Sequence, residues 1–313
     1  MLIAVTGGTG FIGRALVHFH VKCGDQVRIL SRYHQKFPVL DAVTLYQGDL
    51  ISSVDLLSQF VDGVDILYHC AGEIRDQGKM YPVHVTGTKN LCAAAFGKIG
   101  HWVQLSSVGA YGPHASGVLT EKTPLNPIGI YETTKTESDR IVINAAREEA
   151  FTYSILRPSN VFGPSMTNQS LFQMIEIINK GFFFFIGKPG ASANYIHVDN
   201  VVEGLVQCGK KDAARGRIYN LSDHRTIEDF VAVVTDELRK PAPKLRLPEM
   251  PVRWVARMCE RLPHFPLTEP RVNALTNRSI YSIERIQHEL EYTYQVSMED
   301  GLLQMVKVWK QAA

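Results

Sequence analysis

The most constraining feature of this chain is a glycine-rich turn near its amino terminus. Gly7, Gly10 and Gly13 directly follow the apolar run Leu2–Val5 and precede a stretch with helical periodicity. A strand, a glycine turn and a helix in this order bind phosphate groups, because glycine permits the tight turn and the helix N-terminus offers N–H groups to an anion. We therefore predict a dinucleotide site at this turn. Its expected contact residues are Gly7, Gly8, Thr9, Gly10, Phe11, Ile12 and Gly13.

Short apolar runs alternate with amphipathic stretches through the first half of the chain. After Leu2–Val5 the runs are Val27–Leu30, Val43–Tyr46, Ile66–Cys70 and Trp102–Leu105. They lack strict alternation of polar and apolar residues, which is typical of strands buried on both faces. The pattern predicts an α/β protein: a Rossmann-type, doubly wound parallel sheet with helices on both faces.

The pattern loosens after Arg157, where prolines and loops become frequent. With 313 residues the chain is long for one domain and short for two large ones. We expect a dinucleotide-binding domain over residues 1–165 and a smaller substrate-binding lobe over 166–313. The lobe is expected to interleave with the sheet domain, with a segment near 190–225 returning to it.

Composition excludes several other classes of function. The net charge is only +2, with 45% hydrophobic and 20% charged residues, so neither nucleic acid nor a membrane surface is an expected partner. The five cysteines have no C-x-x-C spacing, so we expect buried free thiols, no metal site and a reducing compartment. Because no signal-like or membrane-spanning segment is readable, the expected location is the cytoplasm.

A tyrosine and a lysine form the candidate proton-transfer pair. Tyr131 and Lys135 are four residues apart, so they share one face of a helix. A nearby ammonium group favours phenolate, and we therefore expect Lys135 to lower the pKa of Tyr131 from its usual value near 10. The pair would then exchange a proton with the oxygen of an alcohol or carbonyl during hydride transfer.

Several motifs together resemble a known superfamily. The stretch from Thr6 to Gly13 matches T-G-G-x-G-F-I-G, and Tyr131–Lys135 matches Y-x-x-x-K. Later segments resemble L-R-P-x-N-V-Y-G-P, at residues 156–164, and Y-I-H-V-D-D-V-V, at residues 195–202. These motifs resemble the extended short-chain dehydrogenase/reductase superfamily, in particular its NAD-dependent epimerase/dehydratase family, with a likeness to the 3β-hydroxysteroid dehydrogenase branch.

The resemblance implies roles for further residues. Ser107 corresponds to the catalytic hydroxyl that polarises the reacting oxygen, which completes a Ser107–Tyr131–Lys135 triad, whereas Ser106 is expected to be structural. Arg32, after the second strand, would neutralise a 2′-phosphate and so favours NADP over NAD. Beyond the glycine turn, the expected cofactor contacts are Arg32, Asp49, Leu50, Cys70, Ala71, Gly72, Tyr131, Lys135 and Pro158. The expected substrate contacts are Ser107, Asn160, Tyr195 and Arg271.

The substrate stays open between alternatives. Epimerisation or reduction of a nucleotide sugar is the first expectation, although Ala193 stands where many members carry a diphosphate-binding arginine, for which Arg271 or Arg278 could compensate. A second departure is His84, where asparagine is usual. The alternative is a hydrophobic alcohol or ketone, whose pocket Phe182–Phe185 could line, and a third is a non-catalytic dinucleotide sensor. The resemblance also implies a homodimer, formed by the helices that follow Val83 and Tyr131.

Overall fold

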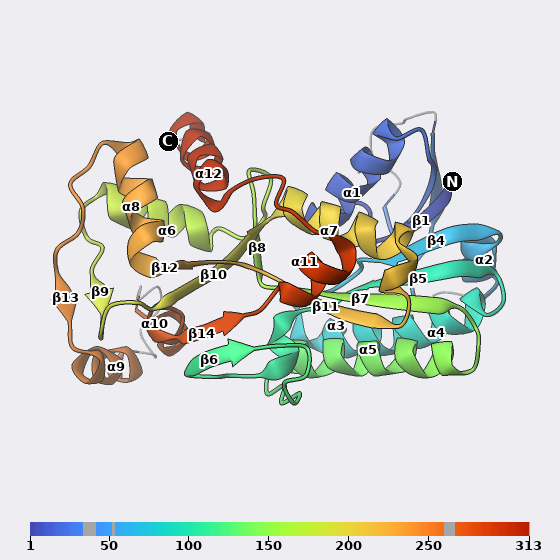
Figure 1. Ribbon diagram of the computed structural model, residues 1–313, viewed down its shortest axis with the longest axis horizontal. Helices are drawn as coiled ribbons and strands as arrows, with labels where there is room; N and C mark the ends of the chain where they lie inside the picture. The colour runs from blue at the N-terminus through green and yellow to red at the C-terminus, as the bar shows by residue number, and fades with distance from the viewer. Residues whose placement is uncertain (34–41, 52–53, 260–266, 313) are drawn as a thin grey trace.

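The computed structural model describes residues 1–33, 42–51, 54–259 and 267–312, and it shows two lobes joined side by side. The larger lobe, on the right of Figure 1, is built around a parallel sheet with both chain-start elements, β1 (Leu2–Thr6) and α1 (Phe11–Lys22). The smaller lobe, on the left, contains mainly segments from the second half of the chain.

The large sheet has seven strands in the order β11-β7-β5-β4-β1-β2-β3, and every neighbouring pair is parallel. The five apolar runs of the sequence correspond to β1, β2, β3, β4 and β5, with Cys70 just after β4, so the predicted doubly wound α/β fold is confirmed. The remaining strands of this sheet are β2 (Gln26–Ser31), β3 (Val43–Gln47), β4 (Val64–His69), β5 (Ile99–Leu105), β7 (Thr152–Pro158) and β11 (Arg217–Leu221).

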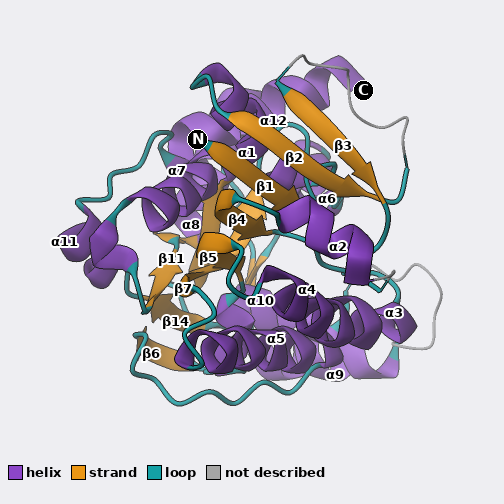
Figure 2. Ribbon diagram, turned by 90° about the vertical axis from the view of Figure 1, so that its right-hand side faces the viewer, coloured by secondary structure: helices purple, strands orange, loops and turns teal. Residues whose placement is uncertain are grey.

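Helices cover both faces of this sheet (Figure 2). On one face α1 packs against α7 (Val198–Lys210), and the apolar layer between them and the sheet includes Leu16, Tyr68 and Leu205. The other face carries three longer helices and a short one, over a second layer around Phe60 and Trp102. They are α2 (Val54–Val61), α3 (Gln77–Tyr81), α4 (Gly87–Ala95) and α5 (Ile130–Arg147).

The smaller lobe has its own apolar core, centred on Ile175, Phe230 and Leu302. Its three-stranded sheet has the order β12-β10-β8, and two short strand pairs, β13-β9 and β14-β6, lie beside it. The strands are β6 (Ser116–Leu119), β8 (Asn160–Phe162), β9 (Phe185–Ile186), β10 (Ser192–His197), β12 (Asp223–Thr226), β13 (Arg246–Leu247) and β14 (Arg278–Tyr281). The helices are α6 (Ser170–Asn179), α8 (Ile227–Leu238), α9 (Glu249–Met258), α10 (Glu269–Thr276) and α12 (Met298–Ala312), with α11 (Glu284–Leu290) beside β11.

The chain crosses between the lobes more than once. It leaves β10 of the small sheet, forms α7 on the large sheet, and then supplies β11 at that sheet's edge before it returns through β12. From β1 the chain adds β2 and β3 on one side of the sheet, and it then adds β4 and β5 on the other side. The strand order therefore reverses between the neighbouring strands β1 and β4. Ligands of doubly wound sheets bind at the carboxyl ends of strands at such a switch point.

The phenylalanine run is divided between surface and core, and the expectation of buried thiols is wrong for one cysteine. Phe182 is exposed, whereas Phe183 and Phe185 belong to the small lobe's core together with residues of α6 and α8. Among the cysteines, Cys92 and Cys208 are buried free thiols, but Cys23 is exposed because it follows the last turn of α1.

Candidate active site

The glycine turn lies directly against the end of β4. Gly7 has a φ of +69°, and a Cβ on it would lie 2.7 Å from the backbone nitrogen of Ala71. A Cβ on Gly13 would lie 2.3 Å from the Gly7 carbonyl oxygen. Gly7 therefore requires glycine because its φ is positive and because it lies against the residues that follow β4. Gly13 requires glycine because α1 begins directly against the turn.

The amino terminus of α1 is suited to an anion. Its N-cap residue is Gly10, which has no side chain to cap the helix, and its first turn contains no acidic residue. By contrast, α8 is capped by the Thr226 hydroxyl, which accepts a hydrogen bond from Asp229 N at 3.1 Å. The positive end of the α1 dipole is thus left to an external group, and a dinucleotide pyrophosphate fits this cradle.

The other expected cofactor residues follow the carboxyl ends of neighbouring strands. Arg32 comes directly after β2 and is exposed, with its guanidinium 5.7 Å from the centre of the Tyr33 ring. After β3, Asp49 is half-buried and Leu50 is buried. Cys70 follows β4, and burial raises the pKa of its thiol to about 12, so it is a packing residue rather than a nucleophile.

Tyr131 and Lys135 lie in the first turns of α5, as their spacing predicts. Lys135 is buried, and its Nζ donates a hydrogen bond of 2.6 Å to the carbonyl oxygen of Leu105, at the end of β5. Burial lowers the pKa of Lys135, and the nearby charge of Asp139 partly opposes this effect. The ammonium group is therefore anchored between α5 and the sheet.

The expected pKa shift of Tyr131 is wrong in direction for this structure. Burial raises the pKa of its phenol to about 12, and the negative charges of Glu132 and Asp139 act in the same direction. The Lys135 cation favours phenolate, but desolvation of a phenolate is the larger effect here. Tyr131 is therefore a neutral phenol at pH 7.

Ser107 lies two residues after the end of β5. Its backbone is extended, and its Oγ accepts a hydrogen bond of 3.1 Å from Gly109 N, so it caps the short 3-10 helix Val108–Tyr111 that packs against α5. Its neighbour Ser106 is turned inward and donates a 2.7 Å hydrogen bond to Asp139 Oδ2. The two serines thus have different environments, and Ser106 is tied to a buried carboxylate.

A buried ion pair supports α5, and its two residues were not among the expected site residues. Asp139 Oδ2 accepts a hydrogen bond of 3.1 Å from Arg157 Nη2, and both side chains are at most 2% exposed. The signal was present, because Asp139 is four residues after Lys135 and eight after Tyr131, so all three share one helix face. The pair connects this face of α5 to β7.

A chain of buried hydrogen bonds links the glycine turn to the same helix. Thr6 Oγ1 bonds to His69 Nδ1 at 2.6 Å, and His69 Nε2 bonds to Thr88 Oγ1 at 3.0 Å. Thr88 Oγ1 in turn bonds to Ser138 Oγ at 2.8 Å. Through these groups β1, β4, α4 and α5 are connected, which fixes the position of the glycine turn relative to the α5 helix that carries Tyr131 and Lys135.

Comparison with known proteins identifies the family. The model of the NAD dependent epimerase/dehydratase family matches residues 3–222, which is more than half of the chain. The chain belongs to this family. It is an NAD-dependent enzyme of the extended short-chain dehydrogenase/reductase type, with a likeness to the 3β-hydroxysteroid dehydrogenase branch.

Individual relatives differ in what their names describe. The chain is 27% identical to the 3 beta-hydroxysteroid dehydrogenase/Delta 5→4-isomerase of Mycobacterium tuberculosis, over 99% of this chain and 91% of that protein. It is 28% identical to the UDP-glucose 4-epimerase of Lactobacillus helveticus, over 74% of this chain and 68% of that protein. The fold is similar to that of UDP-glucuronic acid 4-epimerase from Bacillus cereus in complex with NAD, with a TM-score of 0.77, 20% identity and coverage of 100% and 99%.

The expected substrate residues of this family member are spread over the small lobe and its junction. Asn160 is exposed at the start of β8, where the strand register places it beside Tyr195, and it lies two residues after Pro158, the expected cofactor contact that ends β7. The Tyr195 ring packs against Phe162 and Phe230 at centroid distances of 6.1 and 5.1 Å. Arg271, on α10, donates a 2.8 Å hydrogen bond to Gln173 on α6. No hydrogen bond or ring contact among the described residues joins Tyr195 or Arg271 to Tyr131.

A buried alanine occupies the position at which a diphosphate-binding arginine would be expected. Ala193 is only 3% exposed, and its partner across the strand pair is Arg225. That arginine is engaged by Asp223 at 2.5 Å and by Glu299 at 3.0 Å. Arg278 is also engaged, since it donates to the carbonyl oxygens of Lys188 and Pro189. These arginines are therefore committed to the structure of the lobe.

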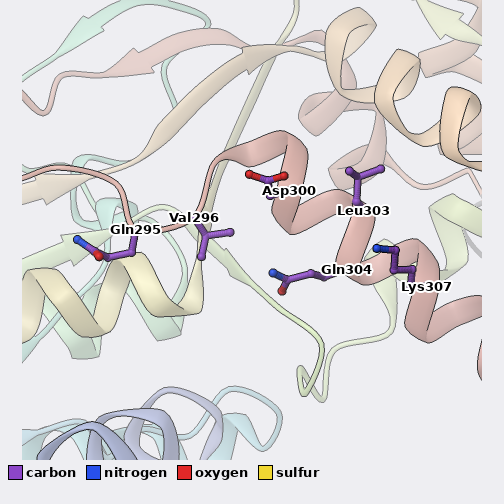
Figure 3. A pocket seen from close by; sticks show the side chains of 6 residues that line it. All are labelled: Gln295, Val296, Asp300, Leu303, Gln304 and Lys307. Atoms are coloured by element: carbon purple, nitrogen blue, oxygen red, sulfur yellow. The ribbon is translucent and has the colours of Figure 1, made fainter.

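A separate pocket of about 340 Å³ lies at the start of α12 (Figure 3). Its lining comes from α12 and the loop before it: Gln295, Val296, Asp300, Leu303, Gln304 and Lys307. None of the expected catalytic, cofactor or substrate residues lines it, so we do not place the reaction there. Within the described part of the chain, no three His, Cys, Asp or Glu residues are grouped as metal ligands, and no helix is long and apolar enough to cross a membrane.

Proposed function

We propose that the chain is an NAD(P)-dependent dehydrogenase or reductase that acts on a hydrophobic alcohol or ketone through Ser107, Tyr131 and Lys135. The observation that carries this proposal is the buried Lys135, anchored to the Leu105 carbonyl one helical turn after Tyr131. Burial of an ammonium group lowers the free energy of unfolding, and such costly buried charges are concentrated at functional sites.

Each member of the triad has a role that its surroundings support. Tyr131, a neutral phenol, donates its proton to the carbonyl oxygen during reduction and takes it back during alcohol oxidation. Lys135 stabilises the phenolate that is left, and Ser107 donates a hydrogen bond to the reacting oxygen. A bound nicotinamide supplies or accepts the hydride at the adjacent carbon. The dinucleotide that carries the nicotinamide would be held by the glycine turn, with Ala71 and Gly72 beside it.

The substrate class follows from what the small lobe offers. A diphosphate is usually gripped by a charge-assisted hydrogen bond from arginine, and here Ala193 is covered while Arg225, Arg271 and Arg278 are all bonded to groups of the chain. One relative that matches nearly the whole chain is named as a hydroxysteroid dehydrogenase. A nucleotide sugar is the second candidate, supported by the UDP-glucose 4-epimerase relative.

A turnover panel tests this proposal. The purified protein is incubated with NAD⁺ or NADP⁺ and a 3β-hydroxysteroid, a secondary aliphatic alcohol or a UDP-sugar, and reduced nicotinamide and sugar epimers are measured. We expect reduced cofactor with the hydrophobic alcohols and no epimer from UDP-glucose. Epimer formation without net cofactor reduction would contradict the substrate class, and cofactor binding without any turnover across a broad panel would indicate the sensing alternative.

We also propose that Arg32 makes NADP the preferred cofactor. Its exposed guanidinium follows β2, where a ribose 2′-phosphate would lie in a doubly wound fold. A charge-assisted hydrogen bond contributes about 1.5–3 kcal/mol, so Arg32→Ala is expected to weaken NADPH binding roughly tenfold or more and to leave NADH binding unchanged. Equal affinities of the unaltered protein for the two cofactors would refute this preference.

The assembly remains a prediction carried by the family resemblance. We propose a homodimer through α4 and α5, with residues 166–313 supplying the substrate-binding surface of each subunit. Sedimentation equilibrium decides between monomer and dimer, and a single species at the monomer mass would contradict the proposal.

A further inference from the structure

A short π-helix interrupts the wall of the proposed active site. It spans Pro82–Thr86, between α3 and α4, and it holds His84 with only 1% of its surface exposed. Single π-turns often occur at functional sites, because the extra residue redirects a side chain. Here the redirected side chain points at the catalytic helix, since the His84 ring packs edge-on against the Tyr131 ring with centroids 5.6 Å apart.

Both ring nitrogens of His84 have a partner, and the partners fix its tautomer. Nε2 accepts a 2.9 Å hydrogen bond from the backbone N–H of Glu73. It therefore carries no proton, so the ring proton is on Nδ1 and is donated to Thr134 Oγ1 at 2.8 Å. The Thr134 hydroxyl in turn donates a hydrogen bond of 2.7 Å to the carbonyl oxygen of Ile130, in the first turn of α5.

This arrangement excludes a second proton on the ring. Protonation of Nε2 would place two donors face to face, at Nε2 and at Glu73 N. Burial and the Lys135 ammonium group both lower the pKa of His84, to about 3, against a small opposing effect of the Glu73 carboxylate and backbone. His69, the other imidazole facing this region, is likewise held neutral by burial. His84 is thus a fixed, uncharged connector at working pH.

We infer that His84 is a positioning residue that fastens the cofactor-side segment Cys70–Glu73 to the catalytic helix through Thr134, and that it holds the Tyr131 ring in place. The inference rests on the proposed function of Tyr131 and of that segment. Cys70–Glu73 leaves β4 beside the glycine turn, so a loose connection at His84 would let the dinucleotide and Tyr131 move apart. Asparagine carries an N–H donor group and a carbonyl acceptor on one planar amide, so it is the conservative replacement for the histidine at this position.

Substitutions at His84 separate this role from simple packing. His84→Phe keeps a ring against Tyr131 and removes both hydrogen bonds, whereas His84→Asn keeps a donor and an acceptor and removes the ring. The matched control is His101→Phe, because His101 is also a buried, neutral histidine, bonded to Thr152 and Ser154 near the opposite end of β5. Thr134→Val removes one of the two partners without touching the histidine.

The measurement is NADH affinity, by titration of cofactor fluorescence on protein whose folding is verified by near-ultraviolet circular dichroism. We expect about tenfold weaker binding for His84→Phe, which corresponds to ~1.4 kcal/mol, and several-fold weaker binding for Thr134→Val. His84→Asn should stay within about threefold of the unaltered protein, and His101→Phe within about twofold. Should His84→Phe not fold, Thr134→Val and His84→Asn carry the test.

The possible outcomes are distinct. Unaltered NADH affinity in His84→Phe and Thr134→Val, or an equal loss in His101→Phe, would overturn the positioning role. An unaltered protein that binds neither NADH nor NADPH would instead overturn the proposed function. As an independent check, ¹⁵N NMR with the His84→Asn protein for assignment should show Nδ1 protonated and Nε2 unprotonated from pH 5 to pH 9, and an imidazolium signal in that range would contradict the inference.

Discussion

Replacement of Asp139 by asparagine should destabilise the sheet domain without changing its shape. The carboxylate is buried and has Arg157 Nη2 at 3.1 Å and Ser106 Oγ at 2.7 Å. Asparagine can still accept the Ser106 hydrogen bond, but it leaves the Arg157 guanidinium buried without a counter-charge. Loss of one partner from a buried pair costs about 3–5 kcal/mol, and the retained hydrogen bond places Asp139→Asn near 3 kcal/mol.

The assay is urea unfolding followed by fluorescence of Trp102, which lies in the core of the sheet domain. Trp254 and Trp309 lie in the smaller lobe and are replaced by phenylalanine so that a single probe reports. Arg157→Met and the double variant complete a cycle, and the double variant should lose less than the two single losses added together, by roughly 2 kcal/mol. A loss below about 1 kcal/mol for Asp139→Asn, or strict additivity, would refute the reasoning.

Two further predictions concern the cofactor turn and acid stability. Gly13→Ala places a Cβ 2.3 Å from the Gly7 carbonyl oxygen, so the turn must shift and NADH affinity should fall at least tenfold; an unchanged affinity would contradict the geometry. His101 has a folded-state pKa of about 4, below its unfolded value near 6.5, so the folded state binds fewer protons and unfolding free energy falls as pH drops from 6.5 to 4. His101→Gln should flatten that slope by up to ~1.4 kcal/mol per pH unit, and an unchanged slope would show that another group is responsible.

Local sequence patterns predicted the elements that depend on local physics. The apolar runs appeared as β1 to β5 because a strand covered by helices on both faces needs apolar side chains throughout. The glycine turn could be predicted because Gly7 and Gly13 are required by close contacts with residues a few positions away or just after the adjacent strand. The Tyr131–Lys135 face followed from helical periodicity alone.

Features that depend on distant contacts were not readable. The pKa of Tyr131 moved upward because the fold buries it beside Glu132 and Asp139, a desolvation that spacing does not reveal. His84 was visible only as a departure from the family motif, and its function required knowledge that Glu73 and Thr134, 11 and 50 residues away, meet its two nitrogens. Arg271 was assigned to substrate, yet it bonds to Gln173, 98 residues away.

The most direct test of the central claim is turnover by Tyr131→Phe. The variant keeps the ring that packs against His84, so the fold and the cofactor turn should be undisturbed. We predict that NADH and NADPH affinities stay within about twofold, while turnover of the best substrate from the alcohol panel falls by about 10²–10⁴-fold, the usual contribution of a positioned acid–base group. Turnover within a few-fold of the unaltered enzyme would contradict the assignment of Tyr131, and with it the proposed chemistry.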